Sequence, residues 1–452
     1  MSSDGQDSQP LFEADGITKE FPRSTSVVDT ILRRSKEPLR AVDDVSISLA
    51  ENEITGVIGE SGCGKTTLLK MMGNLMAPTK GTIRYEGQDI GEMTKAERMN
   101  FRSNVQFIFQ DPFNSLNPRM TVRETLTEVL EIHDFDNHDE RIHDVLERVE
   151  LNPPERFVDQ RPPALSGGEK QRVSIARALI VEPSVLLADE PVSMLDVSTQ
   201  ASILKLLSNL STDLGVSIMY ISHDISTVSY LCEDINVMYL GRLVERGPTE
   251  EIINDPKHPY TNALIQAVPI PDPHNARERT KLEGATPEPV GLGEGCRFRD
   301  RCPSIIPPDD IDISQEGFRE IMTLRQQISK QAVNLDHVEL TLENAGVSES
   351  DESHDSVGHT LYTDRFETEL PDRHRQQVET ALAHVANEDW NSASEALADY
   401  KSVCEQTPRS VETGEHRESA CHLYDEQRAG VAGGSGEGLH SETSATASGE
   451  SQ

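Results

Sequence analysis

The string GESGCGKT at residues 59–66 is the feature that most constrains the fold, because it fits the pattern G-x-x-x-x-G-K-[ST]. An apolar run, Ile54–Gly59, leads into it, and a helical pattern from Lys65 to about Asn74 follows. The glycines let backbone N–H groups turn inward around phosphate oxygens, and the helix adds its positive end. We predict a strand–loop–helix phosphate site; a glycine-rich turn without a ligand is the alternative. The expected binding residues are Gly59, Glu60, Ser61, Gly62, Cys63, Gly64, Lys65, Thr66 and Thr67.

Four side chains are expected to act on the phosphates, on a magnesium ion and on the attacking water. Lys65 should reach the β- and γ-phosphates, and the Thr66 hydroxyl should bind Mg²⁺. The apolar run Val185–Ala188 ends in Asp189 and Glu190, at the strand end where ligands bind in open α/β sheets. Asp189 would then hold Mg²⁺, and Glu190 would polarise the attacking water. On its own, an acidic pair after a strand is usually a turn or a helix cap.

Strands and helices alternate through the first 255 residues. Val197–Leu214 has the pattern of a helix and lies between apolar strands at Ser184–Ala188 and Ser217–Ser222. This alternation is typical of a parallel sheet covered on both faces, so the predicted fold class is α/β. The remaining patterns are alternating strands over residues 11–56 with a break at Ser24–Arg40, polar helices over residues 111–162, and an antiparallel hairpin over residues 235–247.

The acidic composition argues against nucleic-acid binding. The 452 residues include 78 Asp and Glu against 42 Lys and Arg, for a net charge of −36, whereas nucleic-acid binding needs a basic surface. Carboxylates repel one another in dilute buffer and are screened in concentrated salt. Arginine also outnumbers lysine, 30 to 12. We therefore expect a salt-adapted protein; an ordinary acidic protein with an acidic tail is the alternative.

Membrane and secretion signals are missing from the sequence. No stretch has the roughly 18 apolar residues of a membrane-spanning helix, and the first ten residues lack a basic start and an apolar core. Six cysteines are too few for a disulfide scaffold. We expect a soluble chain that stays in the cytoplasm.

The string LSGGEKQR at residues 165–172 decides the class. Ser166 and the two glycines after it would begin a helix whose N-terminus is a second anion-binding site, after that of the phosphate loop. A helix cap without a ligand is the alternative. Here the sequence resembles the ATP-binding cassette (ABC) family, whose signature is LSGGxxxR. The resemblance implies a P-loop nucleotide-binding domain with a RecA-like core, an antiparallel β subdomain and a helical signature subdomain. It also implies ATP contacts from Ser166, Gly167 and Gly168.

Further family elements follow in the family's order. Gln110 matches the glutamine that contacts Mg²⁺ and senses the transporter subunit, and Asp196 ends the loop that crosses the dimer interface. His223 matches the switch histidine that binds the γ-phosphate, so His223 and Glu190 are the expected catalytic residues. Phe21 either stacks on adenine, as the family's aromatic residue does, or belongs to a core strand.

The resemblance also implies partners. In the family, each ATP lies between the phosphate loop of one subunit and the signature of another, so a dimer with itself or with a homologous ATPase follows. Residues 110–118, 258–264 with 268–273, and 295–303 resemble the ATPases of oligopeptide and dipeptide importers. The implied complex contains two transmembrane permease subunits and an extracytoplasmic solute-binding protein. The ATPase would lie peripherally on the cytoplasmic face of the cell membrane.

The expected function is ATP hydrolysis that energises peptide import, with ATP and Mg²⁺ as cofactors. The same role in a nickel or sugar importer is an alternative, because substrate preference resides in the other subunits. A soluble cassette ATPase of DNA or translation machinery is less favoured, since such proteins carry two cassettes or a long coiled coil. A non-hydrolysing regulatory module is disfavoured by the presence of Glu190 and His223.

Four cysteines mark the C-terminal extension. In the family this extension is associated with an iron–sulfur cluster, and the matching residues are Cys296, Cys302, Cys404 and Cys421. Four thiolates suit a [4Fe–4S] cluster, and C-x₅-C differs from structural zinc spacing; four structural thiols are the alternative. About 100 residues separate the second and third cysteines, so this insertion must loop out with its ends close together. Because the ATP site lies in a different part of the chain, cysteine changes are expected to leave basal hydrolysis unaltered.

Composition divides the chain into six segments. They are a disordered N-terminus (1–10), the ABC ATPase domain (11–255), the first part of the C-terminal extension (256–303), an acidic helical insertion (304–403), the second part of the extension (404–428) and a disordered tail (429–452). Within the insertion we expect two helix pairs, separated by a disordered stretch at Ser348–His359.

Overall fold

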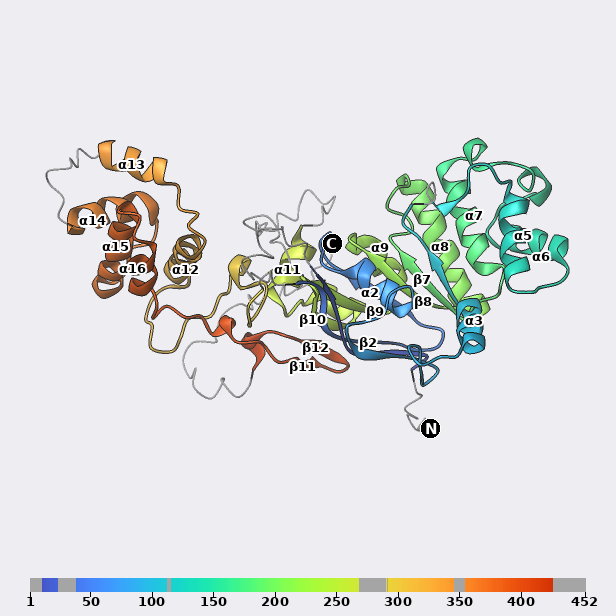
Figure 1. Cartoon of the computed structure of the whole chain (residues 1–452), viewed down its shortest axis with the longest axis horizontal. Coiled ribbons are helices and arrows are strands. Elements are labelled where there is room, and N and C mark those ends of the chain that lie inside the picture. Colours follow the sequence, from blue (N-terminus) through green and yellow to red (C-terminus); the bar gives the residue numbers. More distant parts are fainter. Residues whose placement is uncertain are drawn as a thin grey trace, which may run out of the picture.

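The computed structural model describes residues 10–22, 38–111, 115–267, 290, 292–344 and 354–425. Figure 1 shows a cassette body, formed by residues 10–267 where described, and a group of helices at the opposite end of the molecule. Residues 1–9 and 429–452 of the tails expected to be disordered, most of the Ser24–Arg40 break and the Val268–Pro273 motif lie outside the described residues.

The central sheet positions the phosphate loop. Its parallel part has the order β9 (Asp234–Tyr239), β3 (Ile54–Ile58), β8 (Ser217–Ser222), β7 (Val185–Asp189) and β6 (Val105–Ile108). Every residue of β3, β7 and β8 is buried, as expected for strands covered on both faces. The parallel sheet predicted from strand–helix alternation is confirmed.

An antiparallel sheet packs beside the parallel one. β1 (Phe12–Phe21) lies between β2 (Leu39–Leu49) and β4 (Lys80–Tyr85), and β5 (Gln88–Asp89) pairs with β4. Its inward side chains share a hydrophobic core with α2 (Lys65–Met72), the helix that follows the phosphate loop. The antiparallel sheet therefore supports that helix from one side.

The predicted polar helical region of residues 111–162 lies at the far end of the cassette body (Figure 1). Short 3₁₀ turns at Pro154–Arg156 and Pro162–Ala164 coincide with its proline breaks. None of the described helices combines the length and apolar character needed to cross a bilayer. The described α-helices of the cassette body after α2 are α3 (Lys95–Asn104), α5 (Val122–Ile132), α6 (His138–Arg148), α7 (Gly167–Leu179), α8 (Val197–Leu214), α9 (Ile225–Leu231), α10 (Thr249–Asn254) and α11 (Pro259–Gln266), the last of which belongs to the first part of the C-terminal extension.

The central sheet continues into residues far along the chain. β9 and β10 (Arg242–Pro248) form the predicted hairpin, and β12 (Arg417–Ser419) and β11 (Val411–Gly414) extend the sheet beyond β10. A buried ion pair joins these strands: Arg417 Nη2 lies 2.8 Å from Glu245 Oε1, with side chains 3% and 0% exposed. The residues after the insertion therefore belong to the central sheet, which was not predicted from the sequence.

The insertion forms a helical body with its own hydrophobic core, in which Phe318 and Leu382 are buried. Its ends meet as expected, because the Val403 N–H donates to the Ile306 carbonyl at 3.1 Å. Two predictions are wrong: the second helix group has three helices rather than two, and a helix begins at His354, inside the stretch expected to be disordered. The helices of the body are α12 (Gln315–Ser329), α13 (Leu335–Asn344), α14 (His354–Arg365), α15 (Asp372–Ala386) and α16 (Trp390–Ala396).

Candidate nucleotide site

The phosphate loop joins the end of β3 to the start of α2. Gly64 caps α2 with a φ of 113°, and a Cβ at this position would lie 2.0 Å from the Ala41 carbonyl oxygen. A Cβ on Gly59 would lie 2.1 Å from the Met238 carbonyl oxygen. Only glycine fits at either place, which explains why the loop begins and ends with this residue.

Lys65 is folded against the loop. Its Nζ donates to the carbonyl oxygens of Gly59 at 2.7 Å and Glu60 at 3.1 Å, and the residue is 5% exposed. A buried ammonium needs such acceptors, because its desolvation is otherwise unfavourable. The oxygens of a triphosphate would offer stronger, charged acceptors within reach of the same side chain.

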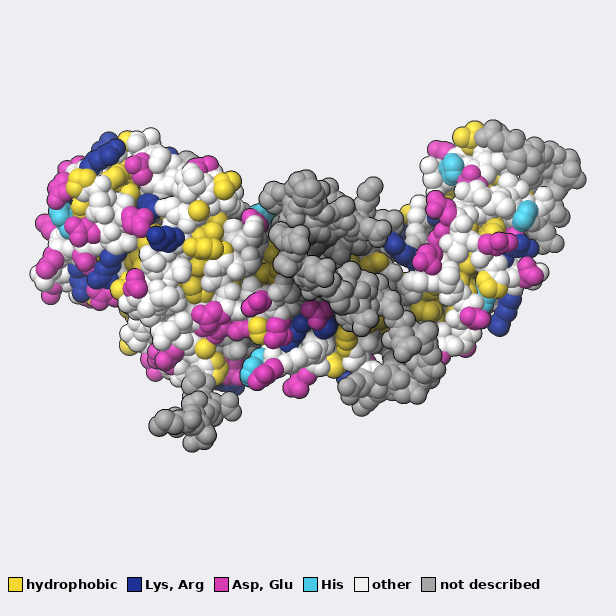
Figure 2. Space-filling view, turned by 180° about the vertical axis from the view of Figure 1, so that it is seen from behind, with side chains coloured by type: hydrophobic (Ala, Val, Ile, Leu, Met, Phe, Trp, Pro, Cys, Tyr) yellow, Lys and Arg dark blue, Asp and Glu magenta, His cyan; other side chains and the backbone are white. Residues whose placement is uncertain are grey.

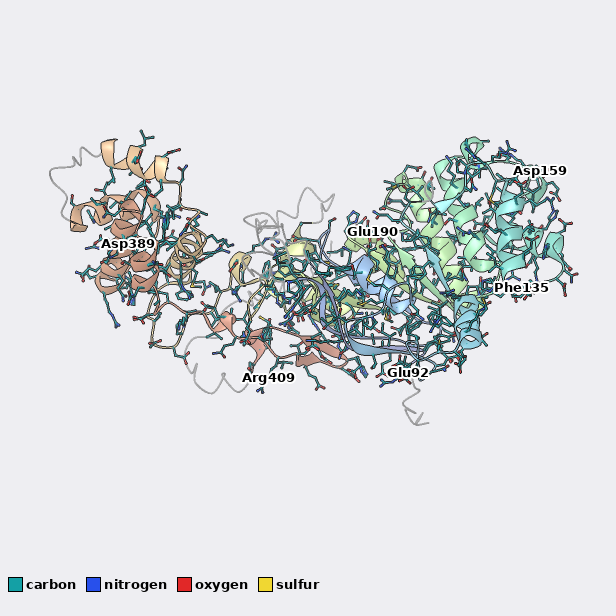
Figure 3. The ribbon with its side chains drawn as sticks, in the orientation of Figure 1. Glu92, Phe135, Asp159, Glu190, Asp389 and Arg409 are labelled. Carbon is teal, nitrogen blue, oxygen red and sulfur yellow. The ribbon has the colours of Figure 1, made fainter. Side chains whose placement is uncertain are left out.

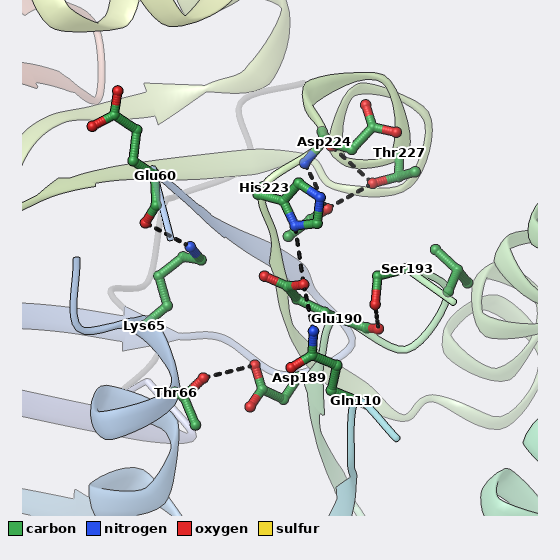
Figure 4. Close-up of polar contacts among 12 residues, drawn as sticks. Glu60, Lys65, Thr66, Gln110, Asp189, Glu190, Ser193, His223, Asp224 and Thr227 are labelled. Carbon is green, nitrogen blue, oxygen red and sulfur yellow. Dashed lines mark hydrogen bonds and ion pairs between the residues drawn. The ribbon is translucent and has the colours of Figure 1, made fainter. Parts of the chain in front are cut away.

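Thr66 and Asp189 face each other where the magnesium ion is expected (Figure 4). Thr66 Oγ1 donates to Asp189 Oδ1 at 3.2 Å. Burial raises the pKa of the Asp189 carboxyl, and the bond from Thr66 opposes this shift. In the described part of the chain, no three His, Cys, Asp or Glu residues gather as a metal site. The pair still fits Mg²⁺, which proteins bind through one or two side chains together with water and substrate phosphates.

Glu190, which Figure 3 labels in the cassette body, is the centre of a polar cluster at the carboxyl end of β7 (Figure 4). Gln110 Nε2 donates to Glu190 Oε2 at 3.0 Å, and His223 Nδ1 lies 3.0 Å from the same oxygen. The Glu190 side chain is 12% exposed, whereas that of His223 is 51% exposed. The carboxylate is therefore held in place by two side chains that come from different strand ends.

Lys65, Thr66, Gln110 and Glu190 line one hollow of about 420 Å³, whereas Asp189 and His223 contact the lining residues Thr66 and Glu190 and do not line it themselves. Phe21, at the end of β1, is half-buried and forms part of its wall, so it is not a core residue. Cys63 is 1% exposed and offers a ligand only its backbone. The other predicted residues that line the hollow are Ser61, Gly62, Gly64, Lys65, Thr66, Thr67, Gln110 and Glu190.

The signature lies outside this hollow, at the start of α7. Ser166 Oγ accepts from the Glu169 N–H at 3.3 Å, and the Ser166 N–H donates to Glu169 Oε2 at 2.8 Å, which lowers the pKa of that carboxyl. A Cβ on Gly168 would lie 2.6 Å from Thr199 Cγ2 of α8. Asp196 caps α8, because its Oδ1 accepts from the Thr199 N–H at 3.1 Å. Four predicted residues thus gather away from the phosphate loop of their own chain: Ser166, Gly167, Gly168 and Asp196.

Comparison with known proteins identifies the family. The ABC transporter family model matches residues 42–193, and the model of the oligopeptide/dipeptide transporter C-terminal region matches residues 244–307. A putative oligopeptide transport ATP-binding protein of Bacillus subtilis is 43% identical over 278 residues, which cover 60% of this chain and 84% of that protein. The chain belongs to the ATP-binding proteins of oligopeptide and dipeptide ABC transporters. It is an ABC-type ATPase.

Other relatives agree with this assignment. A probable peptide ABC transporter ATP-binding protein of Sinorhizobium fredii is 42% identical, covering 66% of this chain and 83% of that protein. A dipeptide transport ATP-binding protein of Haemophilus influenzae is 40% identical, covering 67% and 91%. A third family model, a domain of unknown function (DUF8228), matches residues 315–417. This match covers the helical body and extends beyond the predicted end of the insertion at residue 403.

The four cysteines of the extension lie near one another. The Cys296 N–H donates to the Cys404 carbonyl at 2.8 Å. Burial, together with the neighbouring Cys404 and Cys421 thiols, raises the pKa of the Cys296 thiol to about 12. Burial and the other three thiols also raise the pKa of Cys302. The two parts of the extension therefore meet at Cys296 and Cys404, although the described residues include no group of three or more side chains that could hold a metal ion.

The extension contacts the phosphate loop, and this contact was not predicted from the sequence. Arg301, which directly precedes Cys302, forms a two-bond ion pair with Glu60 of the phosphate loop at 2.8 and 3.0 Å. The Glu60 side chain thus points to the extension rather than to the hollow. The two residues are 241 positions apart, and the only sequence signal was an arginine within the GCRFRDRC string.

Proposed function

We propose that this ATPase binds MgATP in the hollow, hydrolyses it as part of a dimer, and so energises the uptake of oligopeptides or dipeptides through a membrane transporter. The observation that carries the proposal is the gathering of Lys65, Thr66, Gln110 and Glu190 around one hollow. Kinship with peptide-transport ATP-binding proteins supports the substrate class. Phe21 is proposed to stack on the adenine ring at the wall of the hollow.

The polar side chains divide the chemistry among them. Lys65 would exchange its carbonyl partners for the β- and γ-phosphate oxygens, while Thr66, Asp189 and Gln110 would hold the magnesium ion. That ion, when bound, neutralises charge that develops on the phosphates. Glu190 would polarise the water that attacks the γ-phosphate, and its present bonds to Gln110 and His223 keep its carboxylate in place for this task.

The signature residues are proposed to complete the ATP site of a second subunit, either another copy or a homologous ATPase. These residues lie at the N-termini of α7 and α8, and the N-terminus of a helix favours a bound anion. We expect MgATP to convert the Glu190→Gln protein into a dimer, alone or with the homologous ATPase, as measured by light scattering. Lys65→Ala, which removes the main cation for the triphosphate, should stay monomeric. If the Glu190→Gln protein stays monomeric at saturating MgATP, both alone and with the homologous ATPase, the proposed dimer site is contradicted.

A groove of about 260 Å³ next to Gln110 is the proposed contact with a permease subunit. Leu75, Phe109 and Ile132 line it and are 56%, 41% and 57% exposed. Exposed apolar side chains gathered in one groove mark an interaction site. Two permeases bound in this way would hold the dimer on the cytoplasmic face of the membrane. An extracytoplasmic solute-binding protein would then deliver the peptide to them.

We also propose that the protein is adapted to concentrated salt. Acidic side chains are spread over both the cassette body and the helical body on the face seen in Figure 2, and the net charge is −36. Their mutual repulsion is screened when the Debye length falls to about 3 Å in 1 M salt. We expect the melting temperature to rise by at least about 5 °C between roughly 0.1 M and 3 M KCl. A melting temperature independent of KCl would refute salt adaptation.

The four cysteines of the extension are proposed to hold a [4Fe–4S] cluster in the loaded protein, since four free thiols from both parts of the extension supply its usual ligands. Anaerobically purified protein should be brown and contain about four irons per chain. Cys302→Ser should remove the colour, whereas Cys232→Ser, a buried cysteine outside the set, should keep it. Stoichiometric zinc would reject the cluster but keep the four-cysteine site. Metal-free protein with four alkylatable thiols would reject both.

A further inference from the structure

The C-terminal extension contacts the phosphate loop on the side that faces away from the hollow. Arg301 lies in a short 3₁₀ turn, Arg299–Arg301, and its side chain is 8% exposed. Its Nη1 and Nη2 donate to the two carboxylate oxygens of Glu60 at 2.8 and 3.0 Å. Two parallel bonds of this kind orient a carboxylate as well as neutralise it, which the single ammonium of a lysine cannot do.

The backbone of Glu60 is held by the same extension. Its N–H donates to the Tyr260 hydroxyl oxygen at 2.9 Å, and Tyr260 is fully buried. The Tyr260 ring packs against Tyr239 and Phe298, with centroids 4.5 and 5.4 Å away. Arg301 Nη1 also donates to the Tyr239 hydroxyl oxygen at 3.3 Å. Tyr260 cannot turn away from the loop without opening this aromatic core, and Arg301 is bonded to the edge of the core through Tyr239.

Glu60 is the point at which this network meets the nucleotide site (Figure 4). Its carbonyl oxygen accepts from Lys65 Nζ at 3.1 Å, and Lys65 is the side chain expected to move onto the phosphates. Because the side chain, N–H and carbonyl of Glu60 are all bonded, the extension helps to set the shape of the loop before a ligand arrives. A preformed loop binds its ligand more tightly, since less conformational entropy is lost when the ligand binds.

Charge adds a second reason for the contact. The Glu60 carboxylate lies in a loop built to receive a triphosphate, and an unpaired carboxylate there would repel the ligand. Arg301 cancels this charge. The segment that carries Arg301 also contacts the second part of the extension, because the Cys296 N–H in this segment donates to the Cys404 carbonyl, where the chain returns from the helical body.

We propose that Arg301 is a positioning residue that presets the phosphate loop through Glu60, so that the MgATP affinity of this chain depends on its C-terminal extension. The inference rests on the proposed ATP site. It does not require a metal at the cysteines.

The test compares Arg301→Met and Arg301→Lys with the wild-type full chain in nucleotide binding and steady-state hydrolysis. Arg301→Met should raise both the Kd and the KM for MgATP about tenfold with kcat within about twofold, because the lost interaction affects bound and transition states equally. Arg301→Lys should raise the Kd and the KM about threefold, since lysine keeps the positive charge but cannot form the two parallel bonds to the carboxylate. Adding Glu60→Gln to Arg301→Met should recover part of the loss by removing the unpaired carboxylate.

Arg299→Met is the matched control, because Arg299 lies in the same turn but bonds Asp300 and the Glu294 carbonyl instead. Its KM should equal that of the wild type. Unchanged Kd and KM in both Arg301 variants, or a fall in kcat at unchanged KM, would overturn the inference while the proposed function stands. A wild-type chain that binds no MgATP would overturn the proposed function itself. If Arg301→Met does not fold, Arg301→Lys decides between these outcomes.

Discussion

Glu190→Gln is expected to lower kcat for ATP hydrolysis by about 10²–10⁴-fold while leaving MgATP binding intact, because a positioned proton acceptor contributes this much to catalysis. The amide keeps the size of the side chain and its bond to Gln110 or His223. It cannot accept a proton from the attacking water. The measurement is single-turnover hydrolysis together with equilibrium nucleotide binding.

Two comparisons sharpen this result. Lys65→Ala should weaken MgATP binding, since the triphosphate loses its main cation. Glu182→Gln removes a carboxylate that is 59% exposed and pairs with Arg141, away from the hollow, so both kcat and binding should stay at wild-type values. Hydrolysis near the wild-type rate in the Glu190→Gln protein would remove Glu190 from the catalytic role.

Arg417→Ala is expected to destabilise the cassette body by about 3–5 kcal/mol, because it leaves a buried carboxylate without its cation. Glu245 is 0% exposed in its side chain, and Arg417 Nη2 is 2.8 Å from its Oε1. The Glu245 carboxylate also accepts the N–H groups of Lys257 and His258 at 2.9 Å each. Loss of the arginine would therefore disturb both the β10–β12 pairing and the start of the C-terminal extension.

The neighbouring pair on the same two strands provides the control for Arg417→Ala. Arg246 and Glu418 are partners in the β10–β12 register, but their side chains are 40% and 29% exposed. A pair with this exposure contributes about 0–1 kcal/mol, so Glu418→Gln should shift the urea midpoint, followed by circular dichroism, only slightly. Equal small shifts for Arg417→Ala and Glu418→Gln would show that the buried pair does not secure β12.

The local parts of the fold and site were predictable from the sequence, because each depends on residues close together in the chain. The apolar run before Gly59 and the pattern after Lys65 give β3, the loop and α2. The run that ends in Asp189 gives β7, and the signature string gives the cap and first turn of α7. In each case burial or capping chemistry acts within one strand or one helical turn.

The contacts that escaped prediction join residues far apart. β12 has three residues and pairs with β10 about 170 positions earlier, and a strand so short leaves no alternating pattern. Arg301 pairs with Glu60, 241 positions away. It is one of three arginines in the string GCRFRDRC, and nothing in the sequence distinguishes it from the other two as the partner of Glu60. The start of α14 at His354 was missed because the acidic, serine-rich residues around it have the composition of a disordered stretch.

Peptide uptake into vesicles tests the central claim most directly. The chain would be reconstituted with its permeases, its partner ATPase and its solute-binding protein, and given labelled dipeptides and oligopeptides, with nickel and sugars as competing substrates. The account predicts peptide accumulation that requires MgATP on the ATPase side and is lost with Glu190→Gln. Steady ATP hydrolysis with no peptide accumulation, or accumulation of nickel or a sugar instead, would contradict it.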